Sequence, residues 1–494
     1  MAEQMSFATR LRQLTEESPA APVVTDAAGT ISRLELDTLS NQWARALADK
    51  GVRQGDLVSI ALPSDRRFIV AAWAVWKLGA TPQPLSSRIV PAELRAILEV
   101  ASPSLVIADT ELTDAVRCWD TTGAGALSVD PLPDKFSPSW KAPTSGGSTG
   151  RPKVILATSP ATADPLLELA ALFRVRPGDV LLTPAPLCHN APFLTTTMAV
   201  LGGGHAVVMP RFDAETTVRL IEQHQVGWLY AVPTIMNRIA KLPPEVLDSA
   251  DFSSIHTMFH MAAPCADWLK RWWMDRLGSD AVWELYAGTE VQAITMVGGT
   301  EWLTRPGTVG KPVVGQIKIL DEDMQPADPG VVGEIFMRPP SDVPTYRYLG
   351  ASARAVNGWE SLGDLGWMDA EGYLYLSDRM TDMVLVGGIN VYPAEVEAAL
   401  EAHPMVESCC VVGLPDDDLG SRLHAVVHVS GAVTDDELAA FVAGRLAPHK
   451  RPRTYERSAE QLRDDAGKMR RSAIRESRLD RTETLQTPTL KTSA

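Results

Sequence analysis

Residues 144–153 read Thr-Ser-Gly-Gly-Ser-Thr-Gly-Arg-Pro-Lys, a run of small hydroxyl residues and glycines that ends in a base. The backbone N–H groups and hydroxyls of such a loop can turn toward a phosphate, and Lys153 adds positive charge. The loop is not a Walker loop, because Gly150 is followed by Arg151 rather than by Lys and then Ser or Thr. A flexible glycine–serine linker is the alternative interpretation. The segment predicts a phosphate-binding loop.

Helix and strand patterns alternate on both sides of this loop. Apolar residues at helical spacing between positions 36 and 47 precede a short apolar run at 57–62, and the same order recurs between 217 and 233. The apolar stretch 68–76 is far shorter than the roughly 20 residues that span a bilayer, so it predicts a core helix. The alternation predicts an α/β fold with helix-covered, parallel sheets in a large N-terminal domain.

A small α+β unit is predicted downstream of Thr381. Pro393 suits the first turn of a helix. Two strand patterns follow at 406–412 and 423–429, and a second helix starts with a capping-box pattern at Thr434. These elements are enough for a separate small domain.

The expected domain boundaries follow from these patterns. A turn-rich hairpin over 364–375 closes a large domain of residues 1–380, and the small domain spans 381–475. After it the chain becomes polar and rich in threonine, so residues 476–494 are predicted to be a disordered tail.

Length and charge limit the class of protein. The chain has 494 residues, more than the roughly 250–300 over which one hydrophobic core keeps growing, and therefore predicts at least two domains. A formal net charge of −15 argues against a nucleic-acid partner, which requires an excess of Lys and Arg. The five cysteines form no C-x-x-C pair, and the N-terminal residues do not resemble a secretory or transit signal. We expect a cytoplasmic protein without a membrane span; its oligomeric state is unknown from the sequence.

Three more motifs follow the loop along the chain: YAGTE at 286–290, GDLG at 363–366 and AGK at 466–468. Together the four motifs resemble the adenylate-forming superfamily, which contains acyl-CoA synthetases, firefly luciferase and peptide-synthetase adenylation domains. The resemblance extends from about residue 25 to residue 471. The segments GGSTGRPK, CHNAPF, GGINVYPAEVE and DDAGKMRR are most similar to bile-acid CoA ligases and coronafacate ligases. The resemblance implies an ATP- and Mg²⁺-dependent ligase whose small C-terminal domain is mobile.

The resemblance also implies where ATP is bound. The loop around the phosphates would comprise Ser145, Gly146, Gly147, Ser148, Thr149, Gly150 and Lys153. The adenine would lie against Ala263, Pro264, Tyr286, Ala287 and Gly288. Thr289 would contact the α-phosphate and Glu290 would bind magnesium. Asp364 would accept hydrogen bonds from the ribose hydroxyls, with Arg379 nearby.

Further residues are assigned by the resemblance to the acid and to the acceptor. Lys468 would offset the repulsion between a carboxylate and a polyphosphate in the first step. His189 resembles the gate between the ATP and acyl sites, although a structural histidine is the alternative. The acyl pocket would be lined by Phe193, Tyr230 and Val232, with Ala263 and Ala287 nearby. After rotation of the small domain, the acceptor channel would be bordered by Gly387, Gly388 and Ile389.

Three positions depart from the family pattern. The hinge residue is Thr381, where Asp or Lys is common, which leaves the energetics of rotation open. A Gly-Gly-Ala-Pro segment near adenine is replaced by Met-Ala-Ala-Pro at 261–264. The segment 188–191 lacks the aspartate that holds the ammonium of an amino acid, so an α-amino acid is not expected as the acyl donor.

Coenzyme A is the leading acceptor, because the segment GGINVYPAEVE fits an acyl-CoA ligase. The alternative, which the resemblance to coronafacate ligases implies, is an amide ligase that transfers the acyl group to an amino-acid amine. A degenerate adenylate-binding protein without catalysis is a third interpretation. The retention of Lys468, Glu290 and Asp364 argues against it.

Overall fold

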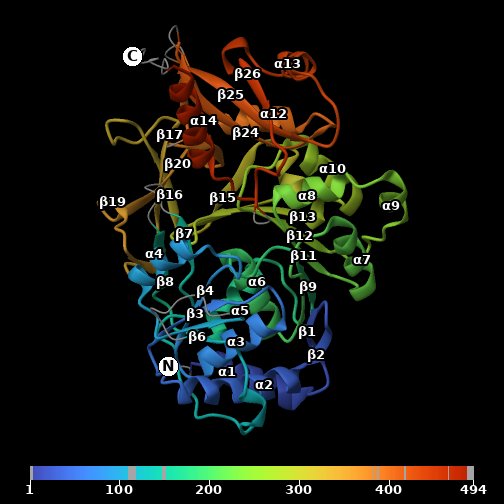
Figure 1. Ribbon diagram of the computed structural model, residues 1–494, viewed down its shortest axis with the longest axis vertical. Coiled ribbons are helices and arrows are strands. Elements are labelled where there is room, and N and C mark those ends of the chain that lie inside the picture. The colour runs from blue at the N-terminus through green and yellow to red at the C-terminus, as the bar shows by residue number, and fades with distance from the viewer. Residues whose placement is uncertain are drawn as a thin grey trace, which may run out of the picture.

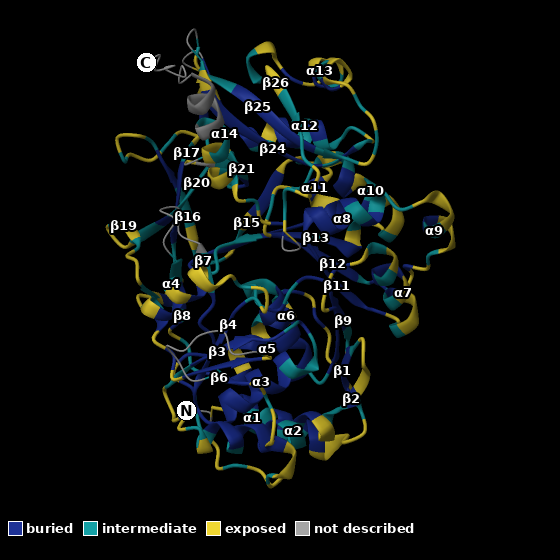
Figure 2. Cartoon of the chain, viewed as in Figure 1, coloured by how far each residue is buried: buried dark blue, intermediate teal, exposed yellow. Residues whose placement is uncertain are grey.

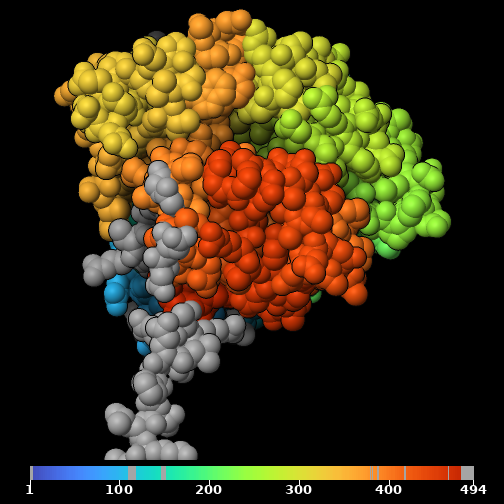
Figure 3. Space-filling view, turned by 90° about the horizontal axis from the view of Figure 1, so that it is seen from above, coloured from blue at the N-terminus to red at the C-terminus, as the bar shows by residue number. Residues whose placement is uncertain are grey.

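The computed structural model describes residues 4–109, 118–146, 152–380, 382–386, 389–416, 419–464 and 467–486. A large mixed α/β domain forms the lower part of the molecule, and a small domain sits above it (Figure 1). Seen from above, the small domain lies between the β16–β21 part and the α7–α10 part of the large domain (Figure 3). The predicted fold class is therefore confirmed. None of the helices in these ranges is long and apolar enough to cross a bilayer.

The large domain is built around a 14-stranded sheet of the described residues. Its parallel strands are β1 (Pro22–Asp26), β9 (Val180–Thr183), β10 (His205–Val208), β11 (Trp228–Ala231), β12 (Thr257–His260) and β13 (Val282–Ala287). The antiparallel part contains β2 (Gly29–Ser32), β14 (Ile294–Gly298), β15 (Thr308–Val314), β16 (Gln316–Leu320), β17 (Gly333–Arg338), β19 (Arg354–Val356), β20 (Trp359–Met368) and β21 (Leu374–Arg379). The predicted hairpin is the pair β20–β21.

Two smaller sheets complete this domain. One contains β3 (Leu57–Ala61), β4 (Thr81–Pro84), β5 (Leu105–Ala108) and β6 (Cys118–Trp119). The other contains β7 (Thr144–Gly146), β8 (Pro152–Ala157) and β18 (Tyr346–Leu349). The larger helices are α1 (Phe7–Glu17), α2 (Arg33–Asp49), α3 (Arg66–Lys77), α4 (Pro91–Ala101), α5 (Ala163–Leu172), α6 (Asn190–Leu201), α7 (Ala214–His224), α8 (Pro233–Ala240), α9 (Pro244–Ser249) and α10 (Asp267–Leu277).

Helix α3 lies at the centre of the N-terminal core, as the apolar stretch predicted. Phe68 to Trp76 are all buried along it (Figure 2). Trp73 and Trp76 contact each other edge to face with ring centroids 5.5 Å apart, and Phe7 of α1 packs edge-on against Trp76 at 4.8 Å. Because this helix is apolar on every side, it is buried between its neighbours rather than lying on a surface.

Four neighbouring parallel strands, β9, β11, β12 and β13, end at one edge of the large sheet. The segments that follow them therefore meet there, and in open α/β sheets this edge is where ligands bind. Cys188, Val232, Ala263 and Ala287 belong to these segments or strand ends. The sheet topology thus brings together residues from four distant parts of the sequence.

The small domain has its own core. It contains α12 (Pro393–Glu401), α13 (Asp435–Ala443), α14 (Arg471–Gln486), β22 (Val384–Val386), β23 (Ile389–Val391), β24 (Val406–Asp416), β25 (Gly420–Val429) and β26 (Thr454–Arg457). Pro393 opens α12 and Thr434 caps α13 with a capping box, both as predicted. The prediction of a disordered tail from residue 476 is wrong over 476–486, because α14 continues through Gln486, and Ile474 and Leu479 on its apolar side pack against β24. Residues 487–494 lie outside the described residues, as does the predicted hinge, Thr381.

A buried ion cluster fixes the end of the chain to the small domain. Glu397 of α12 is 2% exposed and pairs with Arg463, at 3.0 Å, and with Arg471 at the start of α14. Replacement of Glu397 by Gln is expected to lower the free energy of unfolding of this domain by about 3 kcal/mol, because two buried guanidinium groups lose their nearest anion. Among the described residues, Arg463 then keeps Glu401 at 3.5 Å, and Arg471 keeps Asp382 at 3.1 Å. Chemical denaturation followed by circular dichroism measures the change.

The matched control is Glu395→Gln on the same helix, where an exposed carboxylate pairs with Lys450 at 2.7 Å. That pair is solvated and its loss is expected to change stability by less than about 1 kcal/mol. Equal losses for the two variants would contradict the role given to Glu397.

The two domains contact each other through α8 and β24. Asn237 Nδ2 on α8 donates to the carbonyl of Glu407 at 3.2 Å, and Lys241 Nζ donates to the carbonyl of Val406. On the opposite side, Arg470 lies 3.5 Å from Glu93 of α4. These contacts hold the end of the small domain over the carboxyl edge of the large sheet.

Candidate active site

Three side chains from different elements meet beside the predicted phosphate loop. Lys153 of β8 has its Nζ 3.3 Å from Oε1 of Glu290, which lies in the turn after β13. Tyr348 of β18 donates from its hydroxyl to the same carboxylate oxygen at 2.5 Å and accepts a hydrogen bond from Lys153 at 2.9 Å. Burial and the Glu290 charge raise the pKa of Tyr348, so this hydroxyl stays protonated. The cluster presents one cation and one anion side by side.

The phosphate loop itself is described only at its ends. Ser145 and Gly146 belong to β7, where Ser145 pairs with Lys153 of β8. The predicted loop residues Gly147, Ser148, Thr149 and Gly150 lie outside the described residues. The β7–β8 pairing nevertheless sets both ends of the loop beside Glu290. The phosphate-binding role of the loop stays a prediction.

Tyr286 and Asp364, predicted to contact the adenine and the ribose, lie together. The hydroxyl of Tyr286, on β13, donates to Oδ2 of Asp364, on β20, at 2.8 Å. Asp364 stands opposite Arg379 in the β20–β21 register, and the side chain of Arg379 lies outside the described part of the chain. An aromatic ring with a carboxylate at its edge suits a nucleoside, whose base stacks while its ribose hydroxyls donate.

Backbone geometry shapes the neighbouring segments. Ala262 has φ +74, a left-handed conformation that glycine adopts without steric penalty. The chain therefore keeps a glycine-like turn before Ala263 and Pro264 although the residue is alanine. At Gly288, a Cβ would lie 2.3 Å from Cδ1 of Leu362 on β20, so a larger residue would require that side chain to move. Thr289, in the turn that leads to Glu290, is half-buried.

The segment Cys188–His189–Asn190 joins β9 to α6 at the same edge. His189 is the N-cap residue of α6, and its side chain makes no capping hydrogen bond. Burial, with a smaller contribution from Asp464, raises the pKa of Cys188 to about 12, and Lys468 opposes this shift. Cys188 is therefore a neutral thiol, and it lies within electrostatic reach of the loop that carries Lys468.

Lys468 stands on a tight turn of the small domain. Its backbone N–H donates to Asp464 Oδ1 at 2.8 Å, and its carbonyl accepts from Asp464 N at 2.9 Å. Gly467 has φ +75, and a Cβ there would lie 3.5 Å from Val232 and Thr234 of the large domain. The turn is thus seated against the end of β11, beside Cys188.

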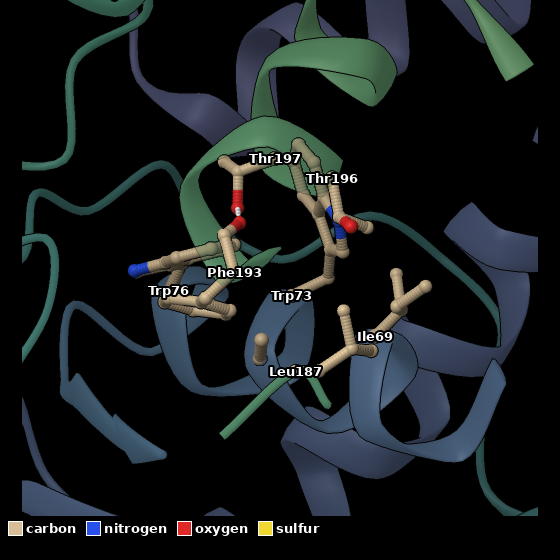
Figure 4. A pocket seen from close by; sticks show the side chains of 8 residues that line it. Ile69, Trp73, Trp76, Leu187, Phe193, Thr196 and Thr197 are labelled. Carbon is tan, nitrogen blue, oxygen red and sulfur yellow. Dashed lines mark hydrogen bonds between the residues drawn. The ribbon is translucent and has the colours of Figure 1, made fainter. Parts of the chain in front are cut away.

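The predicted acyl-pocket residues are packed into the core. Phe193 stacks on Trp140 with ring centroids 6.1 Å apart and on Trp76 at 5.6 Å. It borders a cavity of about 10 Å³, the lower limit of the space that one water needs, which is lined from α3 and α6 (Figure 4). Tyr230 and Val232 are also fully buried. Their contact with an acyl group stays a prediction.

A second cavity of about 20 Å³ lies between the two domains. It is lined by Pro233, Thr234, Asn237, Ala263, Pro264, Glu401, Glu407, Ser408 and Arg463. Ala263 and Pro264, predicted to contact adenine, thus face the small domain. Ile389, on β23, is exposed, whereas Gly387 and Gly388 lie outside the described residues, so the acceptor channel stays a prediction.

The donor set suits magnesium bound together with a substrate phosphate. Among the residues that the structure describes, no group of three or more His, Cys, Asp or Glu side chains is arranged to hold a metal. Mg²⁺ is commonly bound by one or two carboxylates with the phosphates and waters completing its shell. Glu290, 5% exposed and beside Lys153, offers one such carboxylate.

Two site residues were missed by the sequence analysis. Tyr348 lies on a strand with no motif of its own and reaches Glu290 only because β18 pairs with β8. Lys141 precedes the phosphate loop, and its Nζ donates to the side-chain oxygen of Asn190. The one sequence signal for Lys141 was a lysine directly after Trp140 in an otherwise apolar and small segment.

Comparisons with known proteins agree with this arrangement. Residues 11–347 match the family model of AMP-binding enzymes, and residues 395–467 match the model of the C-terminal domain of these enzymes. A long-chain-fatty-acid–CoA ligase of Mycobacterium tuberculosis is 28% identical over 94% of this chain and 97% of its own length.

Two solved structures share the whole fold. The o-succinylbenzoate CoA synthetase of Bacillus subtilis, solved with its acyl-adenylate intermediate, has a TM-score of 0.82 and 25% identity, covering 96% of this chain and 98% of that chain. An amide bond synthetase of Marinactinospora thermotolerans has a TM-score of 0.77 and 23% identity, covering 95% and 99%. The second likeness concerns the fold alone.

Proposed function

Because the chain belongs to the AMP-binding enzyme family, we propose that it activates a carboxylic acid with ATP and then transfers the acyl group to coenzyme A. The first product is an acyl-adenylate, formed with release of pyrophosphate. The observation that carries this proposal is the position of Lys468. The turn that carries it lies against Val232 at the carboxyl edge of the large sheet. The Lys153–Glu290 pair and the Tyr286–Asp364 pair lie at the same edge.

The first step joins two anions. A carboxylate oxygen attacks the α-phosphorus of ATP in line, the bond to the β-phosphate oxygen breaks, and pyrophosphate leaves. Positioning and charge neutralisation are the main contributions of a protein to such a step. Lys153 would neutralise the phosphates, and Lys468 would neutralise charge where the carboxylate meets the α-phosphate. Magnesium held at Glu290 would neutralise phosphate charge when bound.

The second step needs another arrangement of the small domain. The acyl-adenylate is an anhydride that water hydrolyses, and the small domain, seated over the sheet edge, excludes solvent during the first step. In this proposal Lys468 would stand in the path of an incoming acceptor. Rotation of the small domain would withdraw Lys468 and bring Gly387, Gly388 and Ile389 to the site, as the family resemblance implies. Thr381 is the proposed hinge.

The contact between Tyr286 and Asp364 gives a prediction for ATP binding. Replacement of Asp364 by Asn is expected to raise the KM for ATP by about tenfold, because hydrogen bonds from ribose to a carboxylate become hydrogen bonds to a neutral amide. Tyr286→Phe, which keeps the ring and removes the hydroxyl that bonds Asp364, should have the smaller effect. Steady-state pyrophosphate release at varied ATP measures both. A KM for ATP unchanged in Asp364→Asn contradicts the ribose assignment.

Donor and acceptor can be identified in one experiment. The enzyme is incubated with Mg-ATP and a panel of acids that includes palmitate, o-succinylbenzoate and benzoate, and AMP formation is measured. Acids that give AMP are then incubated with the enzyme and either CoA alone or amino acids alone, and the products are identified by mass spectrometry. A CoA thioester is the expected product, and an amide made without CoA would assign the amine acceptor instead. Failure of every acid of a broad panel to give AMP overturns the proposed function.

A further inference from the structure

A second lysine lies beneath the proposed site. Lys141 is 3% exposed and precedes β7 in the large domain. Its Nζ donates to Asn190 Oδ1 and lies 4.6 Å from the ring centre of Trp140. Within the described part of the chain, no carboxylate stands within ion-pair distance of it. Glu290 attracts it electrostatically without contact.

This placement is unfavourable for stability alone. A buried ammonium without an ion-pair partner loses its hydration and gains little in return. Burial accordingly lowers the pKa of Lys141 to about 7, while Glu290 opposes the shift. The other lysines that are buried to this degree, Lys77 and Lys270, each pair with a carboxylate. An apolar side chain would fill the position of Lys141 without that penalty, which points to a role in function.

The position of Lys141 suggests that role. Asn190 is the first residue of α6 and directly follows Cys188 and His189. Lys468, in the small domain, lowers the pKa of Cys188 through its charge. Lys141, in the large domain, donates a hydrogen bond to Asn190. Two lysines therefore flank the segment 188–190. Only Lys468 belongs to the domain that is proposed to move.

We propose that Lys141 is a positioning residue for the acid: its ammonium holds the start of α6 through Asn190 and, when protonated, supplies a positive charge that favours a carboxylate at segment 188–190 in both steps. The inference rests on the proposed function, since it concerns the acid of that reaction. Lys468 supplies charge during adenylation and leaves with the small domain. Lys141 stays with the large domain in both steps.

The charge of Lys141 makes acid binding depend on pH. Asn190 and Trp140, which contact it, do not titrate, and Glu290 is the charged group that acts on it among the described residues. With a pKa of about 7, Lys141 is charged at lower pH and becomes neutral as the pH rises. The acid should therefore bind more weakly above this pH. The informative quantity is the difference between wild type and a Lys141 variant.

The test compares wild type with Lys141→Met, which keeps the length of the side chain and removes the charge. The KM of the acid that is fastest in the AMP-formation panel is measured at about pH 6 and about pH 8.5, on either side of the expected pKa. In wild type, the KM for the acid should rise between the lower and the higher pH. This rise should exceed the change seen in the variant by about fivefold to tenfold. In Lys141→Met, the KM for the acid should already be raised at the lower pH relative to wild type. The KM for ATP should differ from wild type by less than about twofold.

Lys77→Met is the matched control. Lys77 is also buried, but it pairs with Asp37 at 2.6 Å on α2, outside the site. Its loss should lower stability and leave the pH dependence of the acid KM as in wild type. The same pH dependence in wild type and Lys141→Met would overturn the proposal, as would an equal rise of KM for acid and ATP.

A measurement without any acid separates this inference from the proposed function. A lysine whose pKa falls from 10.5 to about 7 on folding binds fewer protons in the native state between these values. The burial of Lys141 therefore costs no free energy of unfolding above the unfolded pKa of 10.5, where the amine is neutral in both states. The protein becomes less stable as the pH falls from there through about 7. The melting temperature of wild type should rise relative to Lys141→Met between about pH 7 and about pH 9.5. If this difference is absent, Lys141 is not a titrating buried amine and the inference fails even when the enzyme forms acyl-adenylates.

Discussion

Replacement of Lys468 by alanine is expected to lower the rate of acyl-adenylate formation by about 10²–10³-fold, the effect of removing one preorganised charge from a site of developing negative charge. The turn that carries Lys468 is held by Asp464 and lies against Val232, so the backbone of this residue is positioned before the reaction begins. Transfer of the acyl group from a chemically prepared acyl-adenylate should fall by less than about threefold, because that step no longer joins two anions. Pyrophosphate exchange measures the first step and product formation from the adenylate measures the second.

The matched control for this variant is Arg470→Ala. Arg470 lies two residues further on, is largely exposed, and stands 3.5 Å from Glu93. Its loss removes a nearby positive charge outside the turn and should change the adenylation rate by less than about threefold. Equal losses in both half-reactions of Lys468→Ala, or equal effects of the two variants on adenylation, contradict the assignment of Lys468.

Replacement of Glu290 by Gln is expected to lower the adenylation rate by about 100-fold at limiting magnesium and to raise the magnesium requirement by about tenfold. The amide keeps the shape of the side chain and can still accept from Tyr348, but it removes the anion that faces Lys153. Excess magnesium should restore part of the rate. Titration of the rate with Mg²⁺ at constant ATP measures the shift.

Glu360→Gln provides the comparison for Glu290. Glu360 lies in the same region and accepts hydrogen bonds from Tyr346 at 2.7 Å and Gln292 at 2.9 Å, without contact to Lys153. Its magnesium titration should match that of wild type. An unchanged magnesium dependence in Glu290→Gln would place the metal elsewhere.

The sequence was most informative where a local pattern has a local cause. The capping box at Thr434 and the proline that opens α12 are decided within one turn of helix, and both were predicted. The apolar stretch of α3 predicted a helix buried on all sides. The prediction of a disordered tail was wrong because α14 gains its stability from apolar contacts with β24, which composition does not reveal.

The candidate site divides in the same way. By itself, the sequence determined the chemical types at the motifs: a base after a glycine-rich loop, a Tyr and a Glu four residues apart, and an Asp and a Lys further along. Their order along the chain was sufficient to recognise the family, since each motif carries its function in a few adjacent residues.

Only the tertiary structure decided which other side chains join them. Tyr348 reaches Glu290 because β18 lies beside β8, and Lys141 reaches Asn190 because the segment before β7 lies against the start of α6. Both contacts join residues that are far apart in the sequence, and their strength depends on burial, which removes water from a charge. Hydrophobic pattern and motif spacing act over a few residues, whereas the desolvation of an ammonium is set by every element that packs around it.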